Sequence, residues 1–159
     1  MVSVPYQNNG SNKNFKKEFN DENSGLVPPQ NIQAEEAVLG GILLDPDSIG
    51  RIADLIKPEA FYINAHQEIY KTALMLHTQG KPTDLTSMSA WLADNGSLEK
   101  IGGNSKLVEL VENVSSTASI EQVASLISDT FIRRQLIRSG NEVVQLGFDQ
   151  TQETNEVLD

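Results

Sequence analysis

The chain has 159 residues, of which 38% are apolar, and its 22 acidic and 12 basic residues give a formal net charge of −10. This length fits one domain with a sizeable core. Such an excess of acid is repelled by the DNA polyanion, so we expect basic protein partners and no direct nucleic-acid binding. The absence of cysteine excludes disulfides and thiolate metal sites. No apolar run approaches the ~20 residues that a membrane span requires, so we expect a soluble intracellular protein.

The first 27 residues are rich in Asn, Ser, Gly and Lys and show no hydrophobic period. Such a composition is typical of a disordered tail. Its lysines, Lys13, Lys16 and Lys17, are balanced by three acidic residues that follow closely. We therefore predict a solvated tail and not a basic binding arm.

A helix is predicted to begin after Asn31, whose side-chain oxygen can accept a hydrogen bond from a first-turn amide. Glu35 and Glu36 follow where the helix dipole favours negative charge. One apolar face is formed by Val38, Leu39, Ile42 and Leu43. Gly40 and Gly41 would weaken the helix by roughly 1 kcal/mol each, so we infer that another backbone packs closely there.

Asp45 is predicted to cap the next helix, with Pro46 at its first position, where the missing amide costs nothing. Its apolar stripe consists of Ile49, Ile52, Ala53, Leu55 and Ile56. Phe61 and Tyr62 are expected to fill the core from the turn that follows.

Asn64 and Gln67 form a capping-box pattern that opens another helix. Its apolar face is predicted to contain Ile69, Tyr70, Ala73, Leu74 and His77. Gly80 ends this helix. The next one is capped by Asp84 or Thr86, and its apolar residues are Leu85, Met88, Trp91 and Leu92.

Gly96 is placed to end that helix, and Gly102-Gly103 marks a turn before a small helix. The apolar residues of the small helix are Leu107, Val108, Leu110, Val111 and Val114. Ser119 with Gln122 then repeats the capping-box pattern.

The longest helical pattern runs from Ile120 to about Gly147. Its first half is predicted to bury Ile120, Val123, Ala124, Ile127 and Phe131. The apolar stripe then shifts to Ile132, Leu136, Val143 and Leu146. Such a shift indicates a helix that packs on two different neighbours, or one that bends near Ser139 and Gly140. We predict that the first half packs on the preceding helices and that the second half meets another subunit.

Arg133, Arg134 and Arg138 form the one concentrated basic group, and the spacing of the last two places them on one helical face. They either contact an acidic partner or subunit, or form a solvated face paired with Asp129 or Glu142. The candidate subunit or partner interface consists of Phe131, Ile132, Arg134, Leu136, Ile137, Arg138, Val143 and Val144.

No strand-like alternation occurs, so the predicted fold class is all-α. Gly80-Lys81 is followed by Pro82, which lacks the amide and the magnesium-binding hydroxyl of a nucleotide-binding loop. His66 and His77 are eleven positions apart without further ligands, so a structural role is predicted for His66. We expect no catalytic site, cofactor site or metal site in this chain.

Several short blocks follow one another along residues 28–148: Val38-Leu39-Gly40, Leu55–Tyr62 (LIKPEAFY), His66–Tyr70 (HQEIY), Gly80–Leu85 (GKPTDL), Gly96–Gly103 (GSLEKIGG) and Arg133–Ile137 (RRQLI). In this order and spacing they closely resemble the N-terminal domain of bacterial replicative DNA helicases of the DnaB family. The resemblance implies a compact multi-helix head over 28–116 after the tail of 1–27. It also implies a long helix over 117–148 that starts a helical hairpin, and a turn with the truncated start of the second arm over 149–159.

The resemblance further implies a collar on a hexameric helicase, in which subunits pair as a trimer of dimers. Its implied partners are other copies of the chain, primase and, in some lineages, a helicase loader. ATP and Mg²⁺ are expected to serve DNA unwinding by a C-terminal domain beyond Asp159. The implied location is the cytoplasm near the nucleoid, or the plastid stroma. The alternative is a stand-alone helical interaction adaptor that has this head without an ATPase domain; a helical DNA-binding regulator would need a basic recognition helix.

Overall fold

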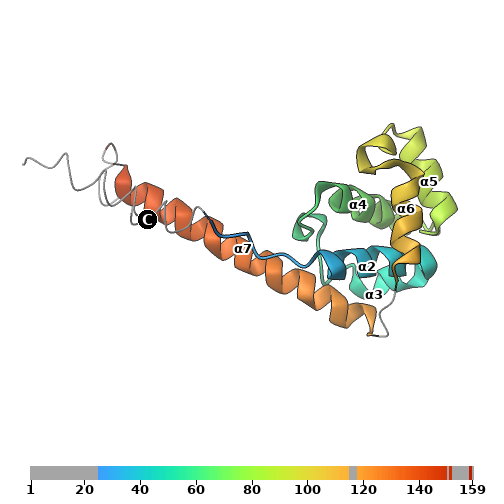
Figure 1. Cartoon of the computed structure of the whole chain (residues 1–159), viewed down its shortest axis with the longest axis horizontal. Helices are drawn as coiled ribbons and strands as arrows, with labels where there is room; N and C mark the ends of the chain where they lie inside the picture. Colours follow the sequence, from blue (N-terminus) through green and yellow to red (C-terminus); the bar gives the residue numbers. More distant parts are fainter. Residues whose placement is uncertain (1–24, 115–117, 150, 152–157, 159) are drawn as a thin grey trace, which may run out of the picture. The chain divides into compact units, whose positions relative to one another are not determined.

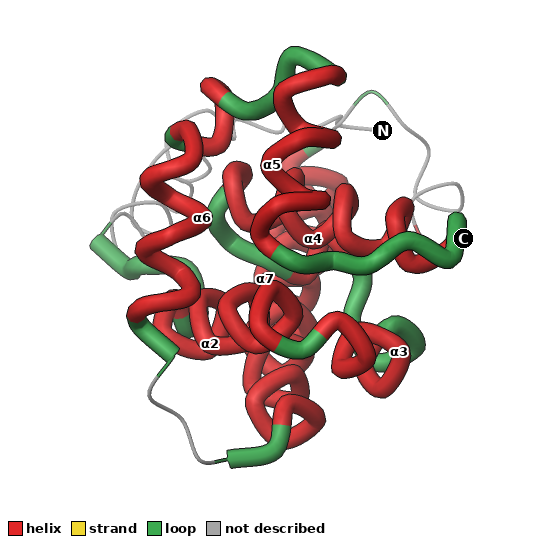
Figure 2. Tube along the Cα trace, turned by 90° about the vertical axis from the view of Figure 1, so that its right-hand side faces the viewer, coloured by secondary structure: helices red, strands yellow, loops and turns green. Residues whose placement is uncertain are grey.

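The computed structural model describes residues 25–114, 118–149, 151 and 158. All regular structure within these residues is helical (Figure 2), which confirms the predicted all-α class. Residues 29–135 form one compact unit, called the head below, and the described residues outside this range belong to a second unit. Within the described residues, no helix combines the length and apolarity that a membrane span requires.

The elements follow one another as Figure 1 labels them: α2 (Ile32–Leu44), the 3-10 turn η1 (Pro46–Ser48), α3 (Ile49–Ile52), the 3-10 turn η2 (Pro58–Ala60), α4 (Asn64–Thr78), α5 (Leu85–Asp94), the 3-10 turn η3 (Glu99–Ile101), α6 (Gly103–Glu112) and α7 (Ile120–Phe148). Helix α7 continues without interruption through Ser139 and Gly140, where the sequence suggested a bend. The predicted head ended at residue 116, whereas the compact unit also includes the first half of α7.

Helix α2 lies at the centre of the core and contacts α4, α5 and α6. Asn31 caps it as predicted, since its Oδ1 accepts a hydrogen bond from the amide of Ala34 at 3.0 Å. The predicted apolar face is also confirmed, because Val38, Leu39 and Ile42 are almost completely buried. Complete burial of such side chains contributes about 1.5–3 kcal/mol each.

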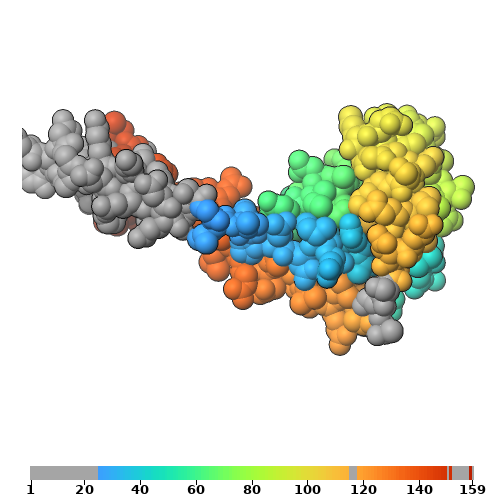
Figure 3. Space-filling view, viewed as in Figure 1, coloured from blue at the N-terminus to red at the C-terminus, as the bar shows by residue number. Residues whose placement is uncertain are grey.

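The glycine pair of α2 marks the place where α6 crosses it (Figures 1 and 2). A Cβ atom at Gly40 would lie 2.2 Å from the carbonyl oxygen of Leu110 and 2.3 Å from Cγ2 of Val114. The predicted close approach of another backbone is therefore confirmed at Gly40. At Gly41 the nearest atom to such a Cβ is Cδ1 of Ile120, at 3.4 Å, which is an ordinary contact. Figure 3 shows the surfaces of α2, in blue, and α6, in yellow to orange, meeting on one side of the head.

The ends of α4 and α5 follow their local sequence signals. Asp84, and not Thr86, caps α5, because its Oδ1 accepts a hydrogen bond from the amide of Ser87 at 2.7 Å. Gly80 and Gly96 follow the two helices with φ of +67° and +66°. A left-handed backbone conformation at such a position favours glycine.

The capping box predicted at Asn64 is wrong. Helix α4 has Ile63 as its N-cap residue, and no side chain of the cap position bonds to the first turn. Gln67 instead donates a hydrogen bond from Nε2 to the carbonyl oxygen of Phe61 at 2.8 Å. The first-turn region is held by a more distant group, the carboxylate of Glu35, which is described with the site.

Three predicted core side chains point to solvent. Leu55 is exposed because α3 ends at Ile52, so the helical stripe does not extend to it. His77 is exposed near the end of α4, where Leu76 is buried in its place. Tyr62 is also exposed, whereas its neighbour Phe61 is buried as predicted.

The ring of Phe61 packs against Tyr70, with centroids 4.9 Å apart. The Tyr70 hydroxyl donates a hydrogen bond to the carbonyl oxygen of Ile56 at 3.1 Å. Burial, with a smaller contribution from Asp54, raises the pKa of Tyr70. The hydroxyl therefore stays protonated. Its hydrogen bond fixes the segment after α3 against the core.

Directly after α7, Oδ1 of Asp149 accepts hydrogen bonds from the amide and the hydroxyl of Thr151 at 3.0 and 2.6 Å. Both hydrogen bonds hold the pKa of the Asp149 carboxyl below its usual range, and the bond from the Thr151 hydroxyl has the larger effect. Most of the predicted N-terminal tail and most of the predicted second hairpin arm lie outside the described residues.

Candidate interaction surface

Helix α7 carries every residue of the predicted interface. It begins after Ser119, whose Oγ accepts a hydrogen bond from the amide of Gln122 at 3.3 Å, so the predicted cap is confirmed. The amide of Glu121 holds the pKa of its own carboxyl below the usual range, and Ser119 and Arg51 act in the same direction. Nε of Arg51 lies 3.6 Å from the Glu121 carboxylate, which links the start of α7 to α3.

The first half of α7 is part of the core of the head, as predicted. Val123, Ala124 and Ile127 are buried there. Ile120 and Phe131 are half-buried and pack against the same core. This half of the helix therefore has no free apolar face of the kind that a partner would need, with the exception of Leu126, which is 50% exposed.

A row of exposed apolar side chains begins at Ile132. Ile132, Leu136, Val143 and Leu146 are 55%, 67%, 67% and 38% exposed. With Ser139 they occupy positions 132, 136, 139, 143 and 146, which is the alternating four-and-three spacing of a heptad repeat. Single exposed apolar residues are common, but a row at this spacing is the pattern of a helix that packs against another helix. We call these five residues the heptad row.

A second apolar row lies about 100° around α7 from the heptad row, because Ile137 and Val144 each follow one of its members by one residue. Ile137 is 51% exposed, and Val144 is half-buried. A helix with two apolar rows needs more than one neighbour to cover them.

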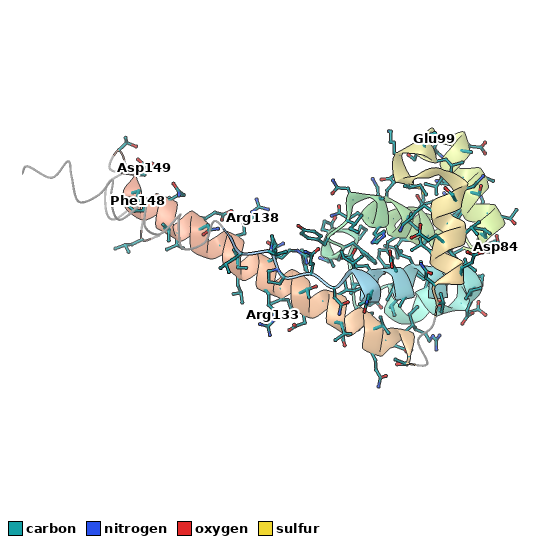
Figure 4. The ribbon with its side chains drawn as sticks, in the orientation of Figure 1. Asp84, Glu99, Arg133, Arg138, Phe148 and Asp149 are labelled. Carbon is teal, nitrogen blue, oxygen red and sulfur yellow. The ribbon has the colours of Figure 1, made fainter. Side chains whose placement is uncertain are left out.

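Two of the three arginines form exposed ion pairs on α7. Nε of Arg133 lies 2.9 Å from the Asp129 carboxylate, and Nε of Arg138 lies 3.1 Å from that of Glu142. Figure 4 shows both arginine side chains extending away from the helix ribbon. Exposed pairs of this kind contribute at most about 1 kcal/mol. The solvated alternative therefore describes Arg133 and Arg138.

Arg134 is different, because it is half-buried and bonds to the main chain of two distant segments. Its Nη1 donates to the carbonyl oxygen of Pro29 at 2.7 Å, and its Nη2 donates to that of Ala60 at 2.6 Å. The guanidinium carbon lies 5.5 Å from the centroid of the Tyr62 ring. Sequence analysis placed Arg134 in the interface, but the structure uses two of its donors inside the head.

The eight candidate interface residues are thus divided by the structure. Phe131 and Arg134 face the head, and Arg138 is paired with Glu142 on the surface. Ile132, Leu136, Ile137, Val143 and Val144 form the apolar part that remains accessible or partly accessible. Their role in an interface remains a prediction. The exposed Leu146 extends this set of accessible apolar residues by one.

A buried polar cluster between α2 and α4 was not predicted. The side chain of Glu35 is 1% exposed, and its carboxylate accepts hydrogen bonds from the amides of Tyr62 at 2.5 Å and Ile63 at 3.4 Å. It also lies 2.8 Å from Nδ1 of His66, which is completely buried. The predicted structural role of His66 agrees with this position. Among the described residues, no group of three or more His, Cys, Asp or Glu side chains is arranged to hold a metal ion.

The residues near Gly80 do not fit a nucleotide phosphate. The Lys81 ammonium lies 5.1 Å from the centroid of the Trp91 ring, and Pro82 follows it with no amide hydrogen and no hydroxyl. A phosphate-binding loop needs consecutive amides, a lysine directed at the phosphates and a Ser or Thr for Mg²⁺. This segment connects α4 to α5 and lacks those groups.

Comparison with known proteins gives a consistent picture. The family model described as "DnaB-like helicase N terminal domain" matches residues 27–129. The chain is 52% identical over 141 residues to the replicative DNA helicase DnaB of Nostoc sp., covering 89% of this chain and 16% of that protein. It is 38% identical over 136 residues to DnaB of Geobacillus stearothermophilus, covering 86% of this chain and 30% of that protein. The chain thus spans less than a third of either relative.

Two solved structures resemble the fold. The N-terminal domain of DnaB helicase from Mycobacterium tuberculosis matches with a TM-score of 0.77 and 36% identity, over 84% of this chain and 94% of that one. A DnaB-like replicative helicase, described together with its interactions with primase, matches with a TM-score of 0.66 and 32% identity. That match covers 80% of this chain and 31% of the other.

Proposed function

The chain belongs to the family of DnaB-like helicase N-terminal domains, and from this premise we propose that it acts as the collar domain of a replicative DNA helicase. In this role it pairs copies of the helicase subunit through α7 and provides a docking platform for primase. The observation that carries the pairing is the heptad row, whose apolar members are 38–67% exposed.

Pairing through the heptad row is favoured by the burial of apolar surface. Each Leu or Ile that passes from water into a packed interface contributes about 1.5–3 kcal/mol, and two copies contribute together. The small side chain of Ser139 in the middle of the row lets a second helix approach closely. The head supplies the rigid base from which α7 starts, because Val123, Ala124 and Ile127 are buried in its core.

ATP, Mg²⁺ and DNA unwinding belong, in this proposal, to the remainder of a longer protein. The support is that the curated relatives are three to six times longer than their matched region, and that the Gly80 segment does not fit a nucleotide phosphate. The domain would then set the spacing and pairing of the subunits. With a net charge of −10, it would not bind the DNA phosphates directly.

The pairing is tested by placing a charge in the heptad row. Leu136→Asp should abolish or weaken self-association of this chain, because a carboxylate cannot be buried in an apolar helix contact without a partner. Sedimentation velocity over a range of concentrations measures the effect. Gln145→Asp is the matched control, since it adds the same charge to an exposed polar position of α7. Equal association of the wild-type chain and the Leu136→Asp variant would contradict the pairing.

Primase docking has its own support and its own test. One structural neighbour is described with its interactions with primase, and an acidic domain suits a basic partner. We expect the sedimentation coefficient to increase when this chain is mixed with the C-terminal domain of primase from the same organism. If neither this chain nor the complete helicase binds that domain, the docking role is wrong. A helicase loader, in hosts that have one, would be tested by the same measurement with the loader in place of the primase domain.

A further inference from the structure

We propose that Arg134 is a latch that determines the residue at which α7 separates from the head. The inference concerns the head alone and stands whether or not α7 pairs copies of the chain. It follows from three observations: the burial pattern along α7, the acceptors that Arg134 uses, and the contrast with the neighbouring arginines.

The first stretch of buried and half-buried positions along α7, which belongs to the head, ends at Arg134. Ala124 and Ile127 are buried, and Phe131 and Arg134 are half-buried. The nine residues that follow, 135–143, are all exposed. Arg134 is therefore the last side chain by which α7 is attached to the head, one turn beyond the last apolar attachment.

The latch joins three parts of the head at one point. Its two hydrogen bonds reach Pro29, in the segment that leads into α2, and Ala60, at the end of η2. Its guanidinium carbon lies 5.5 Å from the ring centroid of Tyr62 and 5.8 Å from that of Phe131. Hydrogen bonds from a charged donor are stronger than neutral ones, and the planar fork of arginine spans two acceptors without further ordering.

Arg134 is connected to the buried polar cluster of Glu35 and His66 through Tyr62. The same Tyr62 whose ring lies beside Arg134 donates its amide hydrogen to Glu35, which also lies against His66. The turn before α4 is thus held on one side by a buried carboxylate and on the other by Arg134.

The arginines on either side cannot replace it. Among the described residues, Arg134 has no carboxylate within ion-pair distance, whereas Arg133 and Arg138 each pair with an acid four residues away on α7 itself. Those local pairs link α7 only to α7. Without Arg134, the last attachment is the half-buried ring of Phe131, so the docked part of the helix should shorten by about one turn.

Hydrogen exchange of the whole chain, measured residue by residue, tests the latch. In Arg134→Gln, the amides of residues 128–135 and of Tyr62 and Ile63 should exchange at least about tenfold faster, because each charge-assisted hydrogen bond is worth that factor or more. Amides in α2 and α6 should change much less. Arg133→Gln, which removes an exposed pair one residue away, should leave the whole pattern unchanged.

The conservative variant separates a latch from a general contribution to stability. Arg134→Lys keeps the charge, but its single ammonium lacks the fork that spans two carbonyls, so residues 128–135 should still exchange faster than in the wild type, and by a smaller factor than in Arg134→Gln. Unchanged exchange in both variants would overturn the proposal. So would acceleration that is uniform over the head and follows the loss of global stability.

Discussion

At the scale of single residues, Glu35 shows how a local prediction can be correct and incomplete. The position lies in the first turn of α2, as the dipole argument requires. Its carboxylate, however, is buried and accepts hydrogen bonds from the segment before α4, 27 and 28 residues along the chain. Nothing near Glu35 in the sequence indicates these donors, because two of the three are backbone amides, which every residue except proline carries.

Replacing Glu35 with Gln should destabilise the head by about 2–3 kcal/mol, because the amide nitrogen of Gln would face donors that now meet a charged acceptor. Urea unfolding followed by circular dichroism measures the change. Glu36→Gln is the matched control, since Glu36 makes one partly exposed pair with Lys106 at 3.3 Å. It should cost less than about 1 kcal/mol. Equal costs for the two substitutions would show that the buried cluster contributes nothing specific.

At the scale of secondary-structure elements, most helix ends were predictable because their signals are local. Asn31, Asp84 and Ser119 act as caps within three residues of their own helix start. The failures have a common cause. The start of α4 depends on Glu35, and the exposure of Leu55 depends on where α3 ends, so neither could be derived from the adjacent sequence.

The crossing of α2 and α6 yields a prediction from two adjacent glycines. Gly40→Ala should destabilise the fold by about 1–3 kcal/mol, because the new methyl group would force α2 away from the carbonyl of Leu110. Gly41→Ala should be neutral or stabilise by up to about 1 kcal/mol, since alanine favours the helix and meets only the end of the Ile120 side chain. Thermal unfolding of both variants provides the comparison. A similar loss at both positions would mean that the glycines serve helix flexibility and not the crossing.

At the scale of the whole molecule, the all-α class and the division of α7 into a head-bound half and an exposed half were predictable from hydrophobic periodicity. The shift of the stripe at Ile132 is visible in the sequence. Hydrophobic periodicity could not show whether Arg134 belongs to the interface or to the head. Helical spacing places Arg134 and Arg138 on one face, but it does not show that only the first of them meets backbone carbonyls.

The two halves of α7 should respond differently to the same kind of substitution. Ile127→Ala removes a side chain that is 1% exposed and should cost about 2–4 kcal/mol of stability. Leu136→Ala, at a position that is 67% exposed, should change the stability of the head by less than about 0.5 kcal/mol. Urea unfolding at low protein concentration, where association does not contribute, measures both. A large loss from Leu136→Ala under those conditions would place this side chain inside the folded head.

The main-chain acceptors of Arg134 have a consequence for the evolutionary record. Contacts between two side chains leave a trace of paired substitutions, because a change in one is compensated by a change in the other. The oxygens of Pro29 and Ala60 are present whatever residue occupies those positions. No second substitution can therefore compensate for the loss of the guanidinium, and position 134 should lack a covarying partner at 29 or 60. Methods that infer proximity from correlated mutations would miss these two hydrogen bonds, and only the contact of Arg134 with the Tyr62 ring could leave such a trace.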